Sequence, residues 1–105
     1  MIKFEEFQKI ELKVGVIEKA EKIEGTEKLV KLEVDTGEKR TMVAGIAHQY
    51  SPKELVGKKI IVVTNLEPRK IKGIESQGML LAALDEEIIS IITPDKEVRP
   101  GSKVA

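Results

Sequence analysis

The feature that most constrains the fold is the alternation of apolar and charged residues within short segments. In residues 30–35, Val, Leu and Val alternate with Lys, Glu and Asp, which is the period of a strand with one buried and one solvated face. Residues 12–16 alternate in the same way, and Gly15 within them suggests a bulge or a sharp coil. The pattern therefore favours a protein built mostly of short strands.

Further strands are predicted along the rest of the chain. Residues 35–38 are typical of a hairpin turn, and residues 41–44 continue as a third strand. Residues 60–63 form a continuous β-branched run, which predicts a strand buried on both faces. Residues 79–84 and 88–92 are two more short apolar runs, so five or six strands are expected.

The clearest local signal is a short helix after the third strand. Ser51 occupies the N-cap, Pro52 the first helical position, Glu54 the third and Gly57 the C-terminal end. This capping box predicts a helix of about two turns. A single helical turn is also predicted over residues 4–7, where two Phe residues lie three positions apart.

The order of these elements is compatible with an all-β fold. A five-stranded barrel of the oligonucleotide/oligosaccharide-binding (OB) type carries a short helix between strands 3 and 4, where the helix is predicted here. Residues 85–105 would then form a C-terminal extension. Because the 105 residues contain no repeat or linker, residues 1–105 are expected to form a single domain.

Composition excludes several kinds of site and protein. With no Cys and one His, the chain is expected to hold no disulfide, thiolate-bound zinc, iron–sulfur cluster or multi-histidine metal site, and no cofactor. No apolar run approaches the roughly 18 residues of a membrane span, and the N-terminal residues do not resemble a signal peptide. We therefore expect a cytoplasmic protein without a membrane partner. The abundance of Lys and Glu is typical of a thermophile, and also of AT-rich genomes.

No catalytic motif is complete in this chain. Gly57-Lys58-Lys59 lacks the first Gly and the hydroxyl residue of a phosphate-binding loop. Ser76 lacks the upstream Gly that a nucleophile elbow requires, and His48 is expected to be an exposed loop residue. The chain is therefore not expected to be an enzyme.

The charges are segregated, although 18 basic and 18 acidic residues cancel overall. Residues 53–72 carry six basic and two acidic side chains, whereas residues 85–97 carry five acidic and one basic. A basic loop attracts phosphates by counterion release; the alternative is a solvated lysine-rich loop. Because Phe4, Phe7 and Tyr50 are the only aromatic residues, stacking of single-stranded bases is limited, so an RNA partner is expected to be folded.

Two uncharged residues near the basic segment have more than one possible role. Asn65 can bond a base edge, a 2′-hydroxyl or its own loop, because its amide both donates and accepts. Met79 is either a flexible apolar contact for RNA or a core residue.

Five segments carry a family resemblance: residues 7–15, 27–37, 43–58, 65–70 and 76–83. The most specific are Asn65-Leu66-Glu67-Pro68-Arg69-Lys70 and Ser76-Gln77-Gly78-Met79-Leu80-Leu81-Ala82-Ala83. In order and spacing they resemble the tRNA-binding domain attached to methionyl-tRNA synthetases, over nearly the whole chain. Relatives of that domain also occur as stand-alone tRNA binders, and a chaperone-like branch shares the fold.

The resemblance implies an OB-fold, usually homodimeric, that binds the outer corner of folded tRNA without strong sequence preference and without catalysis. No DNA partner is expected. A possible further partner is the catalytic chain of methionyl-tRNA synthetase, with this chain as a separate β subunit or a trans-acting factor. The RNA-binding residues carried over by motif position are Lys13, Lys28, Asn65, Arg69, Lys70, Ser76 and Met79. Lys72 joins them on charge alone.

Three departures from the family pattern affect the expected contacts. Lys13 stands where Arg is usual, Glu27 where Asp is usual, and Gly25-Thr26 replaces a Pro-x-Ala approach to the second strand. Each keeps charge or turn character, so they bear on contact geometry more than on function.

A surplus apolar strand at residues 88–92 points to self-association. An exposed strand of this kind invites pairing with another chain, so the predicted dimer interface contains Ile88, Ile89, Ile91 and Ile92. The alternative is a monomer that folds this strand over the open end of its barrel. Two further functional readings are a chaperone-like protein-interaction module and a small enzyme, which the missing motifs disfavour.

Overall fold

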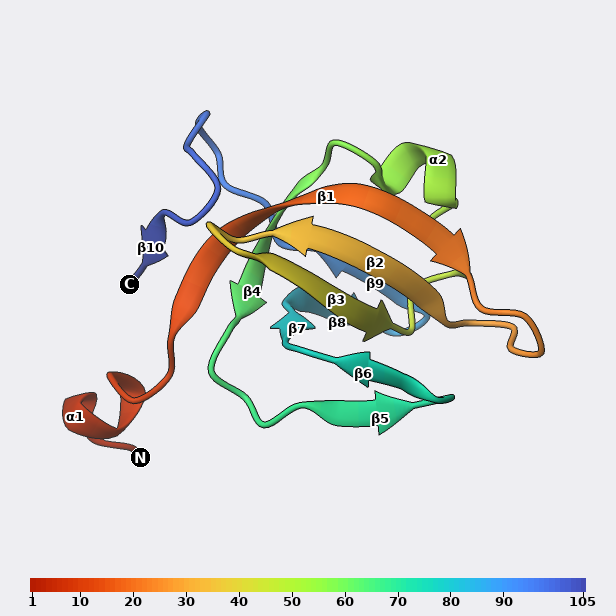
Figure 1. The fold of residues 1–105 in the computed structure, drawn as a ribbon. Helices are drawn as coiled ribbons and strands as arrows, with labels where there is room; N and C mark the ends of the chain where they lie inside the picture. Colours follow the sequence, from red (N-terminus) through yellow and green to blue (C-terminus); the bar gives the residue numbers. More distant parts are fainter.

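The computed structural model describes all residues from 1 to 105. Its elements, in chain order, are α1 (Phe4–Phe7), β1 (Leu12–Lys22), β2 (Val30–Asp35), β3 (Lys39–Ala44), α2 (Pro52–Leu55), β4 (Lys59–Val63), β5 (Arg69–Ile71), β6 (Ile74–Ser76), β7 (Met79–Leu80), β8 (Ala82–Asp85), β9 (Ile88–Ile91) and β10 (Lys103–Val104). The predicted mainly-β fold is confirmed, with the short helix α2 between β3 and β4 (Figure 1). No helix is both long and apolar enough to cross a membrane.

The central sheet is organised around β1, its longest strand. The strand order is β3-β2-β1-β4-β7, and β10 pairs with the start of β1. The first part of β1 pairs with β4 and the second with β2, so β1 must coil between two partners. Gly15 lets β1 lie close to the Val34 side chain of β2, since a Cβ atom at position 15 would lie 2.7 Å from Val34 Cγ1. The register shift lies farther along, between Ile17 and Lys19.

The core fills the concave side of this curled sheet. Ile17, Leu32, Met42, Leu55 and Ile60 are fully buried and belong to one cluster. Fully burying an aliphatic side chain of this size contributes roughly 1.5–3 kcal/mol, so the cluster holds β1 to β4 and α2 together. The expectation of a strand buried on both faces is confirmed for residues 60–63.

The predicted capping box of α2 is present, but the helix is one turn long instead of two. Ser51 Oγ accepts a hydrogen bond from Glu54 N–H, and Glu54 Oε1 accepts one from Ser51 N–H. The chain becomes extended at Val56. It does so because Gly57, at a φ of 88°, donates its N–H to the carbonyl of Ile17 at 2.7 Å and joins the edge of β1.

The sheet is a half-barrel whose edges meet at a seam, and the continuous barrel expected from the sequence is not formed by backbone ladders alone. At the seam, Gln77 N–H donates to Thr41 O at 2.8 Å. Thr41 N–H donates to Gln77 Oε1, and Val43 N–H donates to Ser76 Oγ, both at 3.0 Å. We call these four residues the β3 seam; in it, side chains satisfy backbone donors of β3.

Residues 69–76 form a hairpin, which corrects the loop expected there. Strand β5 pairs with β6, with Ile71 opposite Ile74 and Lys70 opposite Glu75. Lys72 and Gly73 make the turn with φ values of 51° and 78°, the left-handed geometry of a two-residue hairpin turn. Arg69 and Lys70 therefore lie on a paired strand, and Lys72 lies in its turn. Strand β6 of this hairpin lies beside β3 (Figure 1).

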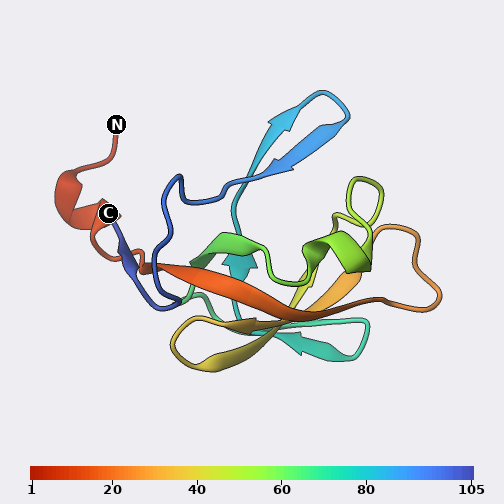
Figure 2. The same cartoon turned by 90° about the horizontal axis from the view of Figure 1, so that it is seen from above.

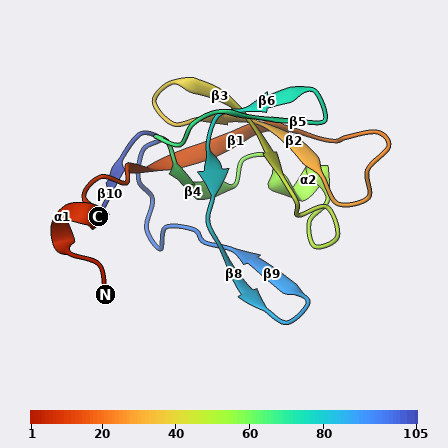
Figure 3. The same ribbon diagram turned by 90° about the horizontal axis from the view of Figure 1, so that it is seen from below.

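The apolar run 79–84 is divided between β7 and β8, and β8 pairs with β9 in a second hairpin that stands away from the sheet (Figures 2 and 3). This β8–β9 arm corrects the expected dimer surface. Ile91 is 7% exposed within the core cluster and Ile89 packs against that cluster, whereas Ile88 and Ile92 are exposed. Alternate strand residues point to opposite faces, so Ile91 fills the core of its own chain.

Replacing Ser76 by Ala is expected to destabilise the fold through the β3 seam. The change leaves Val43 N–H without its acceptor in a half-buried position, at a cost of about 1 kcal/mol, the lower end of the range for an unsatisfied buried donor. Thermal unfolding of Ser76→Ala and of Ser90→Ala measures this effect. Ser90 is exposed and its hydroxyl has no partner, so equal melting temperatures for the two variants would contradict the role of the seam.

Candidate nucleic-acid interface

The β5–β6 hairpin presents cations that no acidic group of the chain neutralises by contact. Arg69, Lys70 and Lys72 are exposed, and none of them takes part in the six ion pairs of the chain. Because the hairpin is tied to β3 through the seam, these charges lie on a positioned surface. Such cations can approach phosphates without first breaking an internal salt bridge.

A cavity of about 480 Å³ brings together three of the predicted RNA-binding residues, Arg69, Ser76 and Met79. Met79 is half exposed, which favours its role as a contact over its role as a core residue. Ser76 is different, because its hydroxyl accepts from Val43 N–H and donates to the carbonyl of Gly78. Ser76 therefore forms part of the cavity floor and does not offer a free hydroxyl.

Lys13 and Asn65 lie in a second group at the start of β1, around a cavity of about 330 Å³ that also includes Lys9 and Lys103. Both polar atoms of the Asn65 side chain are engaged within the chain. Its Oδ1 accepts from Glu11 N–H at 2.9 Å, and its Nδ2 donates to Lys9 O at 2.6 Å. Asn65 is therefore an internal clamp on the segment after α1, a role that differs from the three expected for it.

Glu11 is held as a carboxylate beside this clamp. The hydroxyl of Thr64 donates a hydrogen bond to Glu11 Oε1, and Lys13 Nζ lies 3.9 Å from the same oxygen. The hydrogen bond, followed by the charge of Lys13, lowers the pKa of Glu11 below its ordinary value of 4.5. The positive charge of Lys13 is thus partly balanced by the carboxylate of Glu11, unlike the charges of the hairpin.

Lys28 belongs to neither group. It lies in the connection between β1 and β2, where its carbonyl accepts a hydrogen bond from Ala47 N–H at 2.9 Å. Its exposed ammonium makes no ion pair. The predicted site is therefore divided among the hairpin, the start of β1 and the β1–β2 connection, which are separate in Figure 1.

Arg40 is a positioning residue that the sequence analysis did not identify. Its guanidinium donates to the carbonyls of Thr64 and Gln77 and to the hydroxyl of Thr36. It therefore fixes both ends of the segment that carries the hairpin. No local pattern marks this role, because the bonded carbonyls lie 24 and 37 residues away in the sequence.

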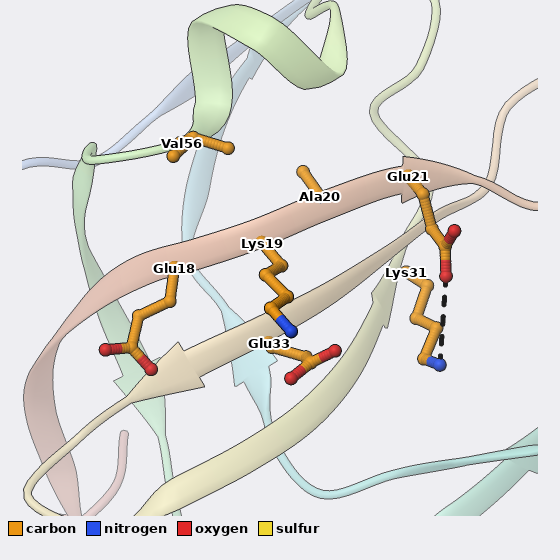
Figure 4. Close-up of a pocket in the computed structure, with 7 residues that line it drawn as sticks. All are labelled: Glu18, Lys19, Ala20, Glu21, Lys31, Glu33 and Val56. Carbon is orange, nitrogen blue, oxygen red and sulfur yellow. Dashed lines mark ion pairs between the residues drawn. The ribbon is translucent and has the colours of Figure 1, made fainter.

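A further cavity of about 480 Å³ lies over β1 and β2 and has a mixed charge (Figure 4). It contains three carboxylates, of Glu18, Glu21 and Glu33, and two ammonium groups, of Lys19 and Lys31. Lys31 is 3.8 Å from Glu21. Because acidic groups outnumber basic ones, this cavity is poorly suited to a polyanion.

A hairpin with unpaired cations on a small curled sheet is suited to contact the phosphates of a nucleic acid. No cluster of three or more His, Cys, Asp or Glu residues that could hold a metal ion occurs beside it. The family model described as "Putative tRNA binding domain" matches residues 12–103. The chain belongs to this tRNA-binding family.

Known proteins resemble the chain along its whole length. It is 52% identical over 105 residues to the methionine–tRNA ligase of Caldanaerobacter subterraneus subsp. tengcongensis, covering 99% of this chain and 16% of that enzyme. A MetRS-related protein from Pyrococcus horikoshii superimposes with a TM-score of 0.94 at 50% identity, covering 100% of this chain and 98% of the other. The chaperone CsaA of Bacillus anthracis superimposes with a TM-score of 0.92 at 28% identity, covering 100% and 99%.

Replacing Glu11 by Gln is expected to make the free energy of unfolding less dependent on pH in the acid range. The pKa of Glu11 is lower in the folded state than 4.5, so its contribution is present above that pH and lost as the pH falls below it. Urea unfolding at neutral pH and well below pH 4.5 compares wild type, Glu11→Gln and Glu5→Gln. Glu5 has no bonding partner; an equal change for both variants would argue against the Glu11–Thr64 contact.

Proposed function

We propose that the protein is a non-catalytic tRNA-binding factor that grips the outer corner of folded tRNA in the cytoplasm and assists methionyl-tRNA synthetase. The observation that carries this proposal is the set of exposed, unpaired cations on the β5–β6 hairpin, in a chain of the tRNA-binding family. The link to the synthetase rests on the similarity to a segment that makes up 16% of a methionine–tRNA ligase.

Replacing Arg69 or Lys70 by Ala is expected to weaken tRNA binding several-fold and leave the melting temperature nearly unchanged. Both side chains are exposed and have no bonded partner, and such substitutions usually change stability by less than about 0.5 kcal/mol. Gel shifts with mixed tRNA give the affinities. Lys96→Ala is the matched control, because it removes one positive charge from between Asp95 and Glu97. An equal loss of affinity in the control would refute a site on the hairpin.

The same experiment tests how the RNA is recognised. About three phosphate contacts made by each hairpin contribute roughly −2 to −3 to the log–log salt slope of tRNA binding. A poly-U strand of equal length is expected to bind more weakly than tRNA, because the chain has few aromatic residues for stacking. A flat salt response or equal affinity for poly-U would contradict the proposed mode.

We propose further that the protein acts as a homodimer through the β8–β9 arm. Leu84 is 75% exposed, Ile88 55% and Ile92 42%. Leu84 and Ile88 belong to the arm, and Ile92 follows it directly; the arm stands away from the sheet (Figure 3). Two-fold pairing would cover one arm with its copy and present two basic hairpins to one tRNA, which raises the avidity.

Replacing Ile88 by Lys is expected to give monomers that bind tRNA much more weakly but remain folded. The side chain is exposed in the single chain, so the new charge opposes association and not folding. Sedimentation velocity at tens of micromolar checks the mass. Glu87→Lys introduces Lys at the neighbouring position, in the turn of the same arm, and serves as control. A wild-type monomer with intact tRNA binding would contradict the dimer.

A chaperone-like protein-interaction module is the second candidate. The specific support is the superposition with chaperone CsaA over the whole of both chains, together with the exposed apolar residues of the arm. Suppression of aggregation of a denatured client protein, unchanged by Arg69→Ala and lost in Ile88→Lys, would favour this function over tRNA binding.

A further inference from the structure

The cavity beneath the β5–β6 hairpin has the walls of a small-molecule pocket. Its volume of about 480 Å³ falls within the roughly 300–1,000 Å³ of pockets that enclose compact ligands. Leu66, Ile71 and Met79 supply apolar surface on its sides. Leu66 is 46% and Met79 50% exposed, so apolar surface is available to a ligand that enters.

One side of this cavity is closely packed and hydrogen-bonded. Gly78 lies there with a φ of 139°, and a Cβ atom at this position would lie 3.0 Å from the carbonyl oxygen of Val63. Ser76 beside it is buried and is bonded to Val43 N–H and Gly78 O. The side of the cavity formed by Ser76 and Gly78 is therefore held by the seam, whereas Leu66 and Glu67 line it from the connection between β4 and β5.

Two charged groups of opposite sign line this cavity without a partner. Glu67 and Arg69 are two residues apart and both line the cavity. Neither side chain makes a hydrogen bond or an ion pair within the chain. The cavity thus offers a carboxylate that needs N–H donors and a guanidinium that needs acceptors, next to an apolar wall.

We propose that this cavity binds one unpaired guanine base of the RNA, an inference that rests on the proposed tRNA-binding function. Guanine carries the O6 and N7 acceptors that match a bidentate Arg, and its 2-amino group donates to a carboxylate. Arg69 takes the first role and Glu67 the second. Met79 lies against the ring, since its polarisable sulfur makes favourable aromatic contacts.

The site separates recognition of a base from the grip on phosphates. Lys70 and Lys72 lie outside the residues that line the cavity and remain available to the backbone. Folded RNA exposes single bases at loops and corners, where proteins read them by edge contacts and by packing against the ring. One base pocket on each protomer therefore adds a local preference to binding by shape and charge.

Nucleotide titration of the full-length protein tests the pocket. GMP, IMP and ribose 5-phosphate are added to ¹⁵N-labelled protein, and the amide shifts of Gly78 and Met79 are followed. IMP lacks the 2-amino group that Glu67 is proposed to accept from. Loss of a hydrogen bond to a charged group is expected to weaken IMP relative to GMP by at least about tenfold.

Glu67→Ala is expected to abolish the preference for GMP over IMP, whereas Glu75→Ala keeps it. The two variants change the net charge equally on the same segment, and Glu75 does not line the cavity. Equal binding of GMP and IMP by wild type, or shifts that ribose 5-phosphate reproduces, would overturn the pocket. If tRNA still binds in an Arg69-dependent manner, only the base pocket fails; if tRNA does not bind, the proposed function fails.

Discussion

The structure depends on two hydrogen bonds in which the side chains of Ser76 and Gln77 accept from backbone N–H groups of β3. A backbone N–H removed from water without a partner costs up to about 1–3 kcal/mol, and here two half-buried donors are satisfied across the edges of a half-barrel. Arg40 adds bonds to two carbonyls at the same junction. The seam therefore does what another strand pair would do in a continuous barrel. It also leaves room for a cavity that backbone pairing would have filled.

This junction connects the stability of the domain to its binding surface. The β5–β6 hairpin contributes no large side chain to the fully buried core, so its position depends on the polar seam and on contacts with β3. Its cations stay exposed because other side chains, such as those of Ser76, Gln77 and Arg40, make the contacts that hold the hairpin in place. A mostly apolar core and a charged surface are thus joined by a narrow polar layer. Substitutions in that layer are expected to affect both the fold and the position of the hairpin, whereas substitutions at the exposed cations are expected to leave the fold intact.

The sequence predicted the features that local residues determine. The capping box of α2, the alternation in β2 and the buried run in β4 are each set by residues within a few positions. The β5–β6 hairpin was missed because its turn is Lys72-Gly73, where Asn-Gly or Asp-Gly is the usual signal. The roles of Asn65 and Ser76 could not be foreseen, because their partners lie 54 and 33 residues away. Ile91 was misplaced because an apolar run alone does not show which face turns inward.

The pairing of β10 with the start of β1 has a consequence for how the domain can be joined to other chains. Val104 lies opposite Leu12, and the two termini lie at the same end of the molecule in all three views (Figures 1–3). Closely spaced termini allow circular permutation and domain insertion. A short linker between the ends would close the polypeptide into a ring without crossing the basic hairpin. Grafting this unit onto an unrelated scaffold would then require attachment at one end of the molecule, with the β5–β6 hairpin left free.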